Sequence, residues 1–385
     1  MNVLFLFSTG KIDGAAIGAW FTLLDTLPAR GVRPFVIVPH DVDGQVAAAL
    51  DARGITWRKL CYTRWLTGTA DEPAAVRKLR RCKFDVTNRH ADRRIGACID
   101  EWGIELIYIC SGNITAGLAE ANKRGLPVVW HVHQLIRRLN CDGRNPSDSD
   151  VQVGPLLAHA DAIIASCRCV KTDLRTRFPM CRNVRAVYNG VAASRICDKP
   201  CILTEERVVF TLAASIEQNK RQQDAVRAFN LVAPSYPGMR LRFVGAGSPA
   251  QEARLKEEIA ASPVAERIEF SGFVDDISQV WAETDVALNC SYSEGCSMAV
   301  AEAMCSGCLL LCSTAEGNVE VIDGAYGLLY ERAKVAALAE KMRWVMENRR
   351  QAQGIARDGK AQALQMFSPQ AQADAVYEVL AGVMR

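Results

Sequence analysis

Short runs of apolar, β-branched residues alternate with longer stretches of helical periodicity along almost the whole chain. This alternation is typical of βαβ units, in which helices cover a parallel sheet. The apolar runs predict strands in two series, at residues 2–7, 33–38, 105–110, 127–131, 162–165 and 184–188, and then at 207–212, 240–244, 267–270, 286–289 and 309–312.

A polar, irregular segment at residues 192–205 separates the two series. A chain of 385 residues exceeds one ordinary hydrophobic core, so two domains are expected. We predict two Rossmann-like, doubly wound α/β domains, at 1–192 and 193–366, with a cleft between them. Ser368 followed by Pro369 predicts a capped terminal helix within 367–385, which we expect to cross back onto the first domain.

The composition is that of a globular protein without a strong overall electric field. Forty-six basic residues against 43 acidic ones leave a net charge of +3, which gives no reason to expect a nucleic-acid partner. The chain begins without the basic region of a signal peptide, and no apolar run reaches the ~20 residues of a membrane span. We therefore expect a cytoplasmic protein, with a peripheral position on the inner face of the cell membrane as a further option.

A local excess of positive charge lies at residues 77–94, where eight Lys or Arg accompany two Asp. This stretch is either a solvated helix face or a helix that touches anionic lipid or a phosphate-bearing acceptor. The fifteen cysteines are an odd number and indicate reduced thiols. Cys305 and Cys308 form a CxxC, but no second ligand pair accompanies them, so no metal site is predicted.

The most informative stretch for chemistry is 291–307, where Glu294 and Glu302 flank a turn that opens a helix. Their spacing of eight residues is a little over two helical turns, so the Glu302 carboxylate shares a face with the helix start. A helix N-terminus suits a diphosphate or sugar hydroxyls, and carboxylates accept hydrogen bonds from hydroxyls. The alternative from spacing alone is a capped helix with two surface glutamates.

The run from residue 284 to 330 strongly resembles the family 4 retaining glycosyltransferases, also called glycosyltransferase group 1, which have the GT-B fold. The resemblance extends past the two glutamates to Ala303, Met304, Gly307, Gly317, Glu320, Gly324 and Gly327. Further segments fall in the order of the family at 161–166, 187–191, 242–247 and 270–274. The resemblance implies that the first domain binds the acceptor and the second binds the nucleotide sugar.

The resemblance also assigns expected roles to single residues. It implies that Glu302 holds the donor ribose, while Glu294 holds the donor sugar. The remaining donor-binding positions that we expect are Gly14, Ser215, Lys220, Gly245, Phe273, Val274, Gly295, Cys296, Ser297 and Met298. It further implies a UDP- or GDP-sugar as donor, with no metal and no other cofactor.

Lys220 takes the place of the phosphate-binding lysine of the family, and a leaving nucleoside diphosphate needs such a cation. Many relatives carry an arginine about five residues earlier, where this chain has Ala214 and Ser215. Ser215, Arg221 or amides at a helix end are the candidates to replace it.

His133 matches the family's active-site histidine at a strand end, so His133, Glu294 and Lys220 are the predicted catalytic residues. His131 is the weaker candidate, and we expect one ring of the pair to face inward and the other outward. Asp13 and Asn113 are expected to line the acceptor pocket.

Other classes of function remain open. Residues 245–250, with Glu269 downstream, fit a dinucleotide fingerprint and would make an NAD(P) oxidoreductase, although a proline interrupts the turn. Asp148 and Asp150 spell the D-x-D of metal-dependent transferases, but they lie in a polar loop. A phosphorylase, a sugar-nucleotide epimerase or a non-catalytic scaffold would also fit. For a transferase, we expect a hydroxyl acceptor on a glycolipid, lipopolysaccharide or polysaccharide precursor.

Overall fold

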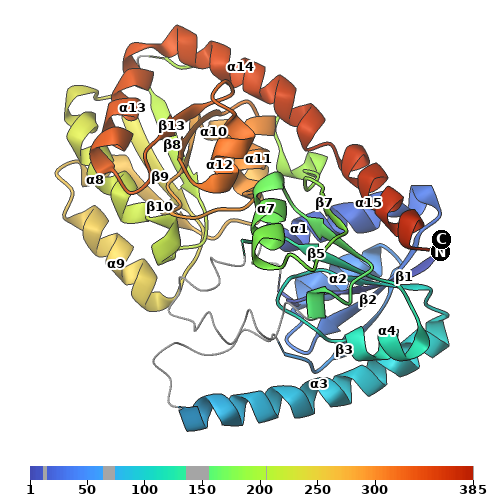
Figure 1. Ribbon diagram of the computed structural model, residues 1–385. Coiled ribbons are helices and arrows are strands. Elements are labelled where there is room, and N and C mark those ends of the chain that lie inside the picture. The colour runs from blue at the N-terminus through green and yellow to red at the C-terminus, as the bar shows by residue number, and fades with distance from the viewer. Residues whose placement is uncertain (12–14, 64–73, 136–155, 205, 385) are drawn as a thin grey trace. The chain divides into compact units, whose positions relative to one another are not determined.

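The computed structural model describes residues 1–11, 15–63, 74–135, 156–204 and 206–384. The chain forms two compact units, one of Met1–Gly190 with Pro369–Arg385 and the other of Val191–Ser368. Each unit is built on its own sheet (Figure 1). We call them unit 1 and unit 2.

Unit 1 contains a seven-stranded parallel sheet in the order β3-β2-β1-β4-β5-β6-β7. Its strands are β1 (Asn2–Leu6), β2 (Arg33–Pro39), β3 (Thr56–Leu60), β4 (Leu106–Ile109), β5 (Val128–Val132), β6 (Ala162–Ala165) and β7 (Val184–Ala186). Its helices are α1 (Ala15–Thr26), α2 (Gly44–Ala52), α3 (Ala74–Trp102), α4 (Leu118–Arg124), α7 (Arg168–Arg177) and α15 (Pro369–Val383). The central strands are buried on both faces, as expected for a sheet with helices on both sides.

The C-terminal helix α15 belongs to unit 1 and packs against α1 and β6. Its buried residues Ala373, Val376, Val379 and Leu380 join the hydrophobic core of that unit. Gln372 accepts a hydrogen bond from the amide of Gly190 at 2.8 Å, and Arg30 pairs with Asp374. The helix therefore begins at Pro369, as the Ser-Pro signal predicts, and is held by apolar burial as well as polar contacts.

Unit 2 contains a six-stranded parallel sheet in the order β10-β9-β8-β11-β12-β13. Its strands are β8 (Val208–Ala213), β9 (Met239–Val244), β10 (Ile268–Gly272), β11 (Val286–Asn289), β12 (Leu309–Ser313) and β13 (Leu328–Tyr330). Its helices are α8 (Gln222–Val232), α9 (Pro249–Ala260), α10 (Ile277–Glu283), α11 (Met298–Cys305), α12 (Glu316–Ile322), α13 (Val335–Glu347) and α14 (Arg349–Met366).

In both sheets the strand order reverses once, between β1 and β4 in unit 1 and between β8 and β11 in unit 2. Loops that leave the carboxyl ends of the two central strands diverge at such a point and open a crevice, where ligands of doubly wound sheets bind. Ligands are therefore expected at the loops after β8 and β11 in unit 2, and at those after β1 and β4 in unit 1.

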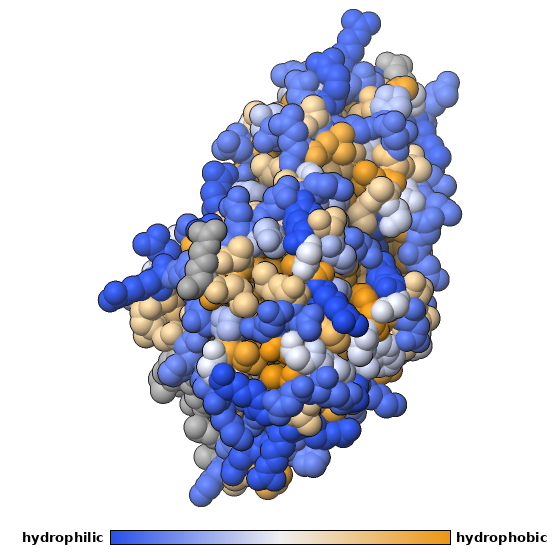
Figure 2. Space-filling model, turned by 90° about the vertical axis from the view of Figure 1, so that its right-hand side faces the viewer, coloured by the Kyte–Doolittle hydropathy of each residue, from blue (hydrophilic) through white to orange (hydrophobic). Residues whose placement is uncertain are grey.

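Two further features concern the surface and the predicted elements. In the part of the chain that the structure describes, no helix is both long and apolar enough to cross a membrane. The face drawn in Figure 2 is largely hydrophilic, with hydrophobic patches between the charged side chains. All eleven predicted strands are confirmed to within two residues at each end, whereas β3 and β13 were not predicted.

Candidate active site

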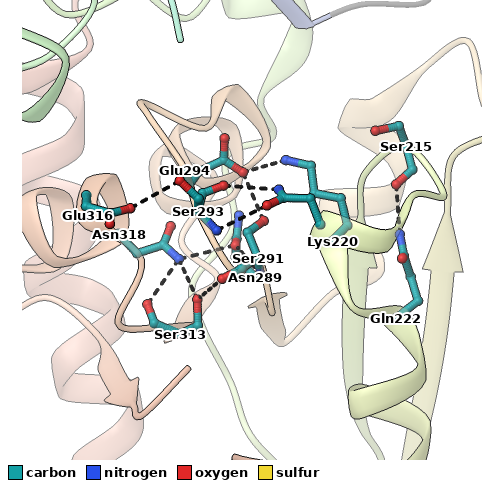
Figure 3. Close-up of polar contacts among 11 residues, drawn as sticks. Ser215, Lys220, Gln222, Asn289, Ser291, Ser293, Glu294, Ser313, Glu316 and Asn318 are labelled. Atoms are coloured by element: carbon teal, nitrogen blue, oxygen red, sulfur yellow. Dashed lines mark hydrogen bonds and ion pairs between the residues drawn. The ribbon is translucent and has the colours of Figure 1, made fainter. Parts of the chain in front are cut away.

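The loops after β8 and β11 bring Lys220 and Glu294 together, although 74 residues separate them in sequence. The ammonium of Lys220 pairs with Oε2 of Glu294, and Ser291 Oγ donates to the same oxygen at 2.9 Å (Figure 3). Glu294 is 5% exposed, so its charge lies in a poorly hydrated place. A buried carboxylate is tolerated where a cation and hydrogen bonds compensate it, and here both are present.

Hydrogen bonds to the backbone fix the loop that carries Glu294. The side chain of Asn219 donates to the carbonyl of Ser293 at 3.0 Å and accepts from the amide of Ser293 at 3.2 Å. Behind the loop, the buried Asn318 donates to Asn289 at 3.2 Å and to the carbonyl of Ser313 at 3.1 Å (Figure 3). The carboxylate is thus positioned before any ligand arrives.

A close backbone approach locks the same loop from the other side. Gly317 donates its amide to the carbonyl of Glu294 at 3.0 Å, and a Cβ added to Gly317 would overlap the carbonyl of Gly295. Gly295 and Cys296 are buried, Ser297 is the N-cap of α11, and Met298 is its first residue. The predicted sugar-binding segment therefore runs directly into a helix N-terminus, whose first amides have no acceptor within the helix.

Glu302 lies on the buried side of α11 and is 2% exposed. Its carboxylate pairs with Arg195, which lies in the 3-10 turn Ala193–Arg195. Burial raises the pKa of Glu302, while Arg195 and the indole of Trp281 favour its charged form. In this structure the carboxylate expected to hold ribose already pairs with Arg195, a residue that the sequence analysis did not single out.

The loop after β8 is held by its own contacts. Ser215 is exposed, and its carbonyl accepts a hydrogen bond from the side chain of the buried Gln222 at 2.8 Å. Gly245, at φ 133°, leaves no room for a Cβ beside the carbonyl of Ala214. Arg221 donates from Nε to Asp224 at 2.6 Å. Lys220 is therefore the cation of this loop that faces Glu294.

The segment expected to contact the base follows β10. Phe273 is 52% exposed and Val274 is partly exposed. The amide of Gly245 donates to the carbonyl of Gly272 at 2.7 Å, which ties this segment to the turn after β9. A Cβ on Gly245 or Gly247 would collide with the protein's own backbone, so glycine is needed at both positions whether or not a pyrophosphate binds there. This weakens the dinucleotide interpretation.

In unit 1, His133 follows β5 and contacts two residues that the sequence did not single out. Trp20 Nε1 donates to His133 Nε2 at 3.1 Å, and the Asn189 side chain lies 3.3 Å from Nδ1. Both partners present donor nitrogens, the indole Nε1 of Trp20 and the amide Nδ2 of Asn189, and a neutral imidazole accepts at one ring nitrogen only, so these contacts do not assign the tautomer of His133. Burial lowers the pKa of His133 to about 4, so the ring is neutral at physiological pH.

His131 is fully buried, and Tyr108 Oη lies 2.7 Å from its Nδ1. Burial and the neighbouring His133 lower its pKa well below the ordinary value. The expectation that one ring faces inward and the other outward is wrong. Residues two apart on a strand share a face, and the two ring centroids lie 3.9 Å apart.

Asn113 follows β4 at the reversal point of unit 1, where it is 9% exposed and accepts a hydrogen bond from Ser111 Oγ at 2.8 Å. Asp13, Gly14 and the Asp148–Asp150 motif lie outside the described residues. Cys305 and Cys308 are buried free thiols, and burial raises the pKa of Cys305 to about 12. The structure thus describes these two cysteines as packing residues, not as activated thiols.

Comparison with known proteins agrees with this geometry. The family model for glycosyl transferases group 1 matches residues 206–348, and the model for glycosyltransferase family 4 matches residues 19–195. EpsD of Bacillus subtilis (strain 168), which carries a glycosyltransferase name, is 27% identical over 162 residues. That match covers 42% of this chain and 42% of EpsD, so the chain spans less than half the length of this curated relative.

Solved structures resemble the chain over nearly its whole length. HepE of Anabaena, solved with UDP-glucose, has a TM-score of 0.80 at 20% identity and covers 99% of this chain and 100% of its own. Sucrose-phosphate synthase of Thermosynechococcus elongatus has a TM-score of 0.80 at 15% identity, covering 99% and 98%. The two parallel-sheet domains therefore have the GT-B fold, and the protein is a glycosyltransferase. Since the two family models together match most of the chain, it belongs to the family 4 glycosyltransferases.

Proposed function

We propose that the protein transfers a sugar from a UDP-sugar to a hydroxyl acceptor, with retention at the anomeric carbon and without a metal ion. The contact between Lys220 and Glu294 carries the proposal, because it places a cation for the diphosphate beside a carboxylate for sugar hydroxyls. HepE, which shares the fold, was solved with UDP and with UDP-glucose, and this favours UDP over GDP.

In this proposal unit 2 holds the donor and unit 1 the acceptor. Glu294 accepts hydrogen bonds from sugar hydroxyls, and the amides at the start of α11 face the sugar. Glu302 accepts from the ribose once it exchanges its contact with Arg195. Phe273 and Val274 flank the base, and their partial exposure leaves them accessible to it.

The chemical step needs charge stabilisation on the leaving diphosphate. As the bond from the anomeric carbon to the phosphate oxygen breaks, the ammonium of Lys220 stabilises the growing negative charge. The acceptor hydroxyl attacks from the face that the diphosphate leaves, and a phosphate oxygen takes its proton. His133 takes part as a neutral hydrogen-bonding group, since its depressed pKa keeps the ring uncharged.

The acceptor is proposed to be lipid-linked and reached at a membrane surface through α3. Val76, Leu79 and Val86 are exposed at 39%, 71% and 65%, and spacings of three and seven residues place them along one side of the helix. The exposed Lys78 and Lys83 lie beside them. Apolar side chains flanked by lysines suit the interface of a membrane with anionic lipids.

The transfer is tested by incubating the protein with a panel of UDP- and GDP-sugars in EDTA, with and without glycolipid acceptors. We expect UDP release that requires an acceptor, and NMR of the product should show the anomeric configuration of the donor. Inverted product or complete dependence on added Mg²⁺ or Mn²⁺ would contradict the proposal. Turnover of the donor with no hydroxyl acceptor would instead indicate an epimerase, and turnover with phosphate alone a phosphorylase.

The membrane contact has its own test. We expect co-sedimentation with vesicles of phosphatidylcholine and 30% phosphatidylglycerol, weaker binding to phosphatidylcholine alone, and loss of binding in a Leu79→Asp, Lys83→Glu variant. A matched variant, Lys256→Glu on α9 of unit 2, should bind as the wild type does. Equal binding of all proteins to both vesicles would refute the contact through α3.

A further inference from the structure

Two thiols at the start of α7 lie close enough to react with each other. Cys167 is the N-cap of the helix and Cys169 lies in its first turn, and the two Sγ atoms are 3.3 Å apart. Both belong to unit 1, and neither is part of a disulfide. Neither has a role in the proposed transfer.

The two cysteines differ in access. Cys167 is fully buried, whereas Cys169 is partly exposed. An oxidant can therefore reach Cys169 first, while Cys167 lies beside it and is shielded from solvent. This arrangement of one accessible and one resolving thiol is typical of redox-sensitive cysteine pairs.

The surroundings also favour reaction at this pair over the deeply buried thiols. The first turn of a helix carries partial positive charge, which favours a thiolate there. In contrast, burial raises the pKa of Cys201 to about 11 and that of Cys290 to about 12. Burial also raises the pKa of Cys110 well above its ordinary value. These deeper thiols stay protonated and unreactive.

We infer that Cys167 and Cys169 form a reversible disulfide that regulates unit 1. The thiolate of Cys169 attacks a hydroperoxide, giving a sulfenic acid and an alcohol, or water when the oxidant is hydrogen peroxide. The thiol of Cys167 then displaces water from the sulfenic acid as the S–S bond forms. Two thiols lose two electrons and two protons in total, and the peroxide bond is reduced. A small-molecule dithiol reverses the step by thiol–disulfide exchange.

We expect closure of this bond to disturb the β6–α7 junction. An S–S bond of about 2.05 Å is more than 1 Å shorter than the present separation, so the two side chains have to turn and strain is placed on the backbone of residues 167–169. Ser166 precedes them, donates its amide to the carbonyl of Val132 at 3.0 Å and donates Oγ to the carbonyl of His133 at 3.2 Å. The disturbance is thereby passed to His133, and we expect the disulfide to lower the transfer rate.

Formation of the disulfide does not depend on the proposed function, whereas its effect on transfer does, so the experiment measures both. Full-length protein is treated with hydrogen peroxide, free thiols are alkylated, and the protein is digested with trypsin. Trypsin cuts after Arg168, so the disulfide would link the peptide that ends at Arg168 to the peptide Cys169–Lys171. We expect this linked pair in the wild type and in a Cys82→Ser control, its absence in Cys169→Ser, and its loss after dithiothreitol.

In parallel, we expect peroxide to lower the transfer rate of the wild type severalfold and reversibly, and to leave Cys169→Ser at its untreated rate. UDP binding, which involves unit 2, should not change. Recovery of both cysteines alkylated after peroxide treatment would overturn the disulfide, whatever the activity. A linked pair with unchanged transfer would overturn the regulatory role while the disulfide stands. A protein that forms the linked pair but transfers no sugar would count against the proposed function alone.

Discussion

Replacement of Gly317 by alanine tests whether the close backbone approach behind Glu294 positions the loop that carries this carboxylate. A Cβ at Gly317 would overlap the carbonyl of Gly295 and lie 3.1 Å from the carbonyl oxygen of Glu294. Real Cβ atoms do not come within 3.0 Å of other heavy atoms, so the two backbone segments must separate by more than about 1 Å. The hydrogen bond from Gly317 to Glu294, now 3.0 Å, would then be lost.

The expected loss of stability follows from the overpacking and from the lost hydrogen bond. Overpacking in a tight site costs about 1–3 kcal/mol, and a lost hydrogen bond adds about 1 kcal/mol. We therefore expect Gly317→Ala to destabilise unit 2 by roughly 3 kcal/mol, which lowers the melting temperature by about 6–12 °C for a domain of this size. Because Glu294 moves with the loop, UDP-sugar affinity or turnover should fall on the order of 100-fold.

The assay is a thermal melt with and without UDP-sugar, followed by initial rates at a temperature where the variant is folded. Gly354→Ala is the matched control, since Gly354 lies in α14 and a Cβ there meets nothing within 4 Å. That change should be neutral or stabilise by about 0.5–1 kcal/mol. If Gly317→Ala melts within a degree of the wild type and binds donor equally well, the close approach does not position the loop.

Three further predictions concern charge. Lys220→Met should lower kcat about 100-fold, measured at saturating donor, because one cation at the leaving group is lost; an unchanged kcat would remove it from the phosphate site. Glu302→Gln should weaken UDP binding about 10- to 100-fold in calorimetry, and equal binding would exclude a ribose contact. In the folded protein the pKa values of His131 and His133 lie below their values in the unfolded chain. The unfolded chain therefore binds protons first, so the stabilisation from the two neutral rings is full above pH ~6.5 and is lost as the pH falls towards 4. Lowering pH from 7.5 to 5.5 should cost about 2.5 kcal/mol in melts, and clearly less in His131→Gln; an equal loss in both proteins would refute this.

The parts of the fold that could be predicted are those whose apolar pattern is continuous. The central strands are buried on both faces and therefore read as apolar runs. The strand β3 has the sequence TWRKL and lies at the sheet edge with most of its side chains exposed, so it lacks such a run. The strand β13 has three residues and is defined by pairing with β12, which no local pattern reveals.

The candidate site was predictable to the extent that its residues lie in family motifs. Glu294 and Lys220 could be named from the sequence, but not their contact, because the reversal of strand order brings their loops together. Arg195 lies within the irregular segment 192–205 and belongs to no motif, yet its guanidinium pairs with the Glu302 carboxylate. Trp20 has the pattern of an ordinary core residue of α1, although its indole N–H donates to His133.

Two of the buried carboxylates of unit 2, Glu294 and Glu302, explain why cations lie in the proposed donor site. Glu294 is compensated by Lys220, and Glu302 by Arg195, so both charges are offset while the donor is absent. Under the proposed function, a nucleoside diphosphate brings further negative charge, and the same cations turn to it while the carboxylates exchange them for hydroxyl groups of the sugar and ribose. Removing one partner leaves the other charge buried and alone, which is more damaging than removing both. The effects of Lys220 and Glu294 substitutions should therefore be strongly non-additive. A double-mutant cycle on stability measures the contact between the two side chains, and the same cycle on UDP-sugar binding measures their contacts with the donor.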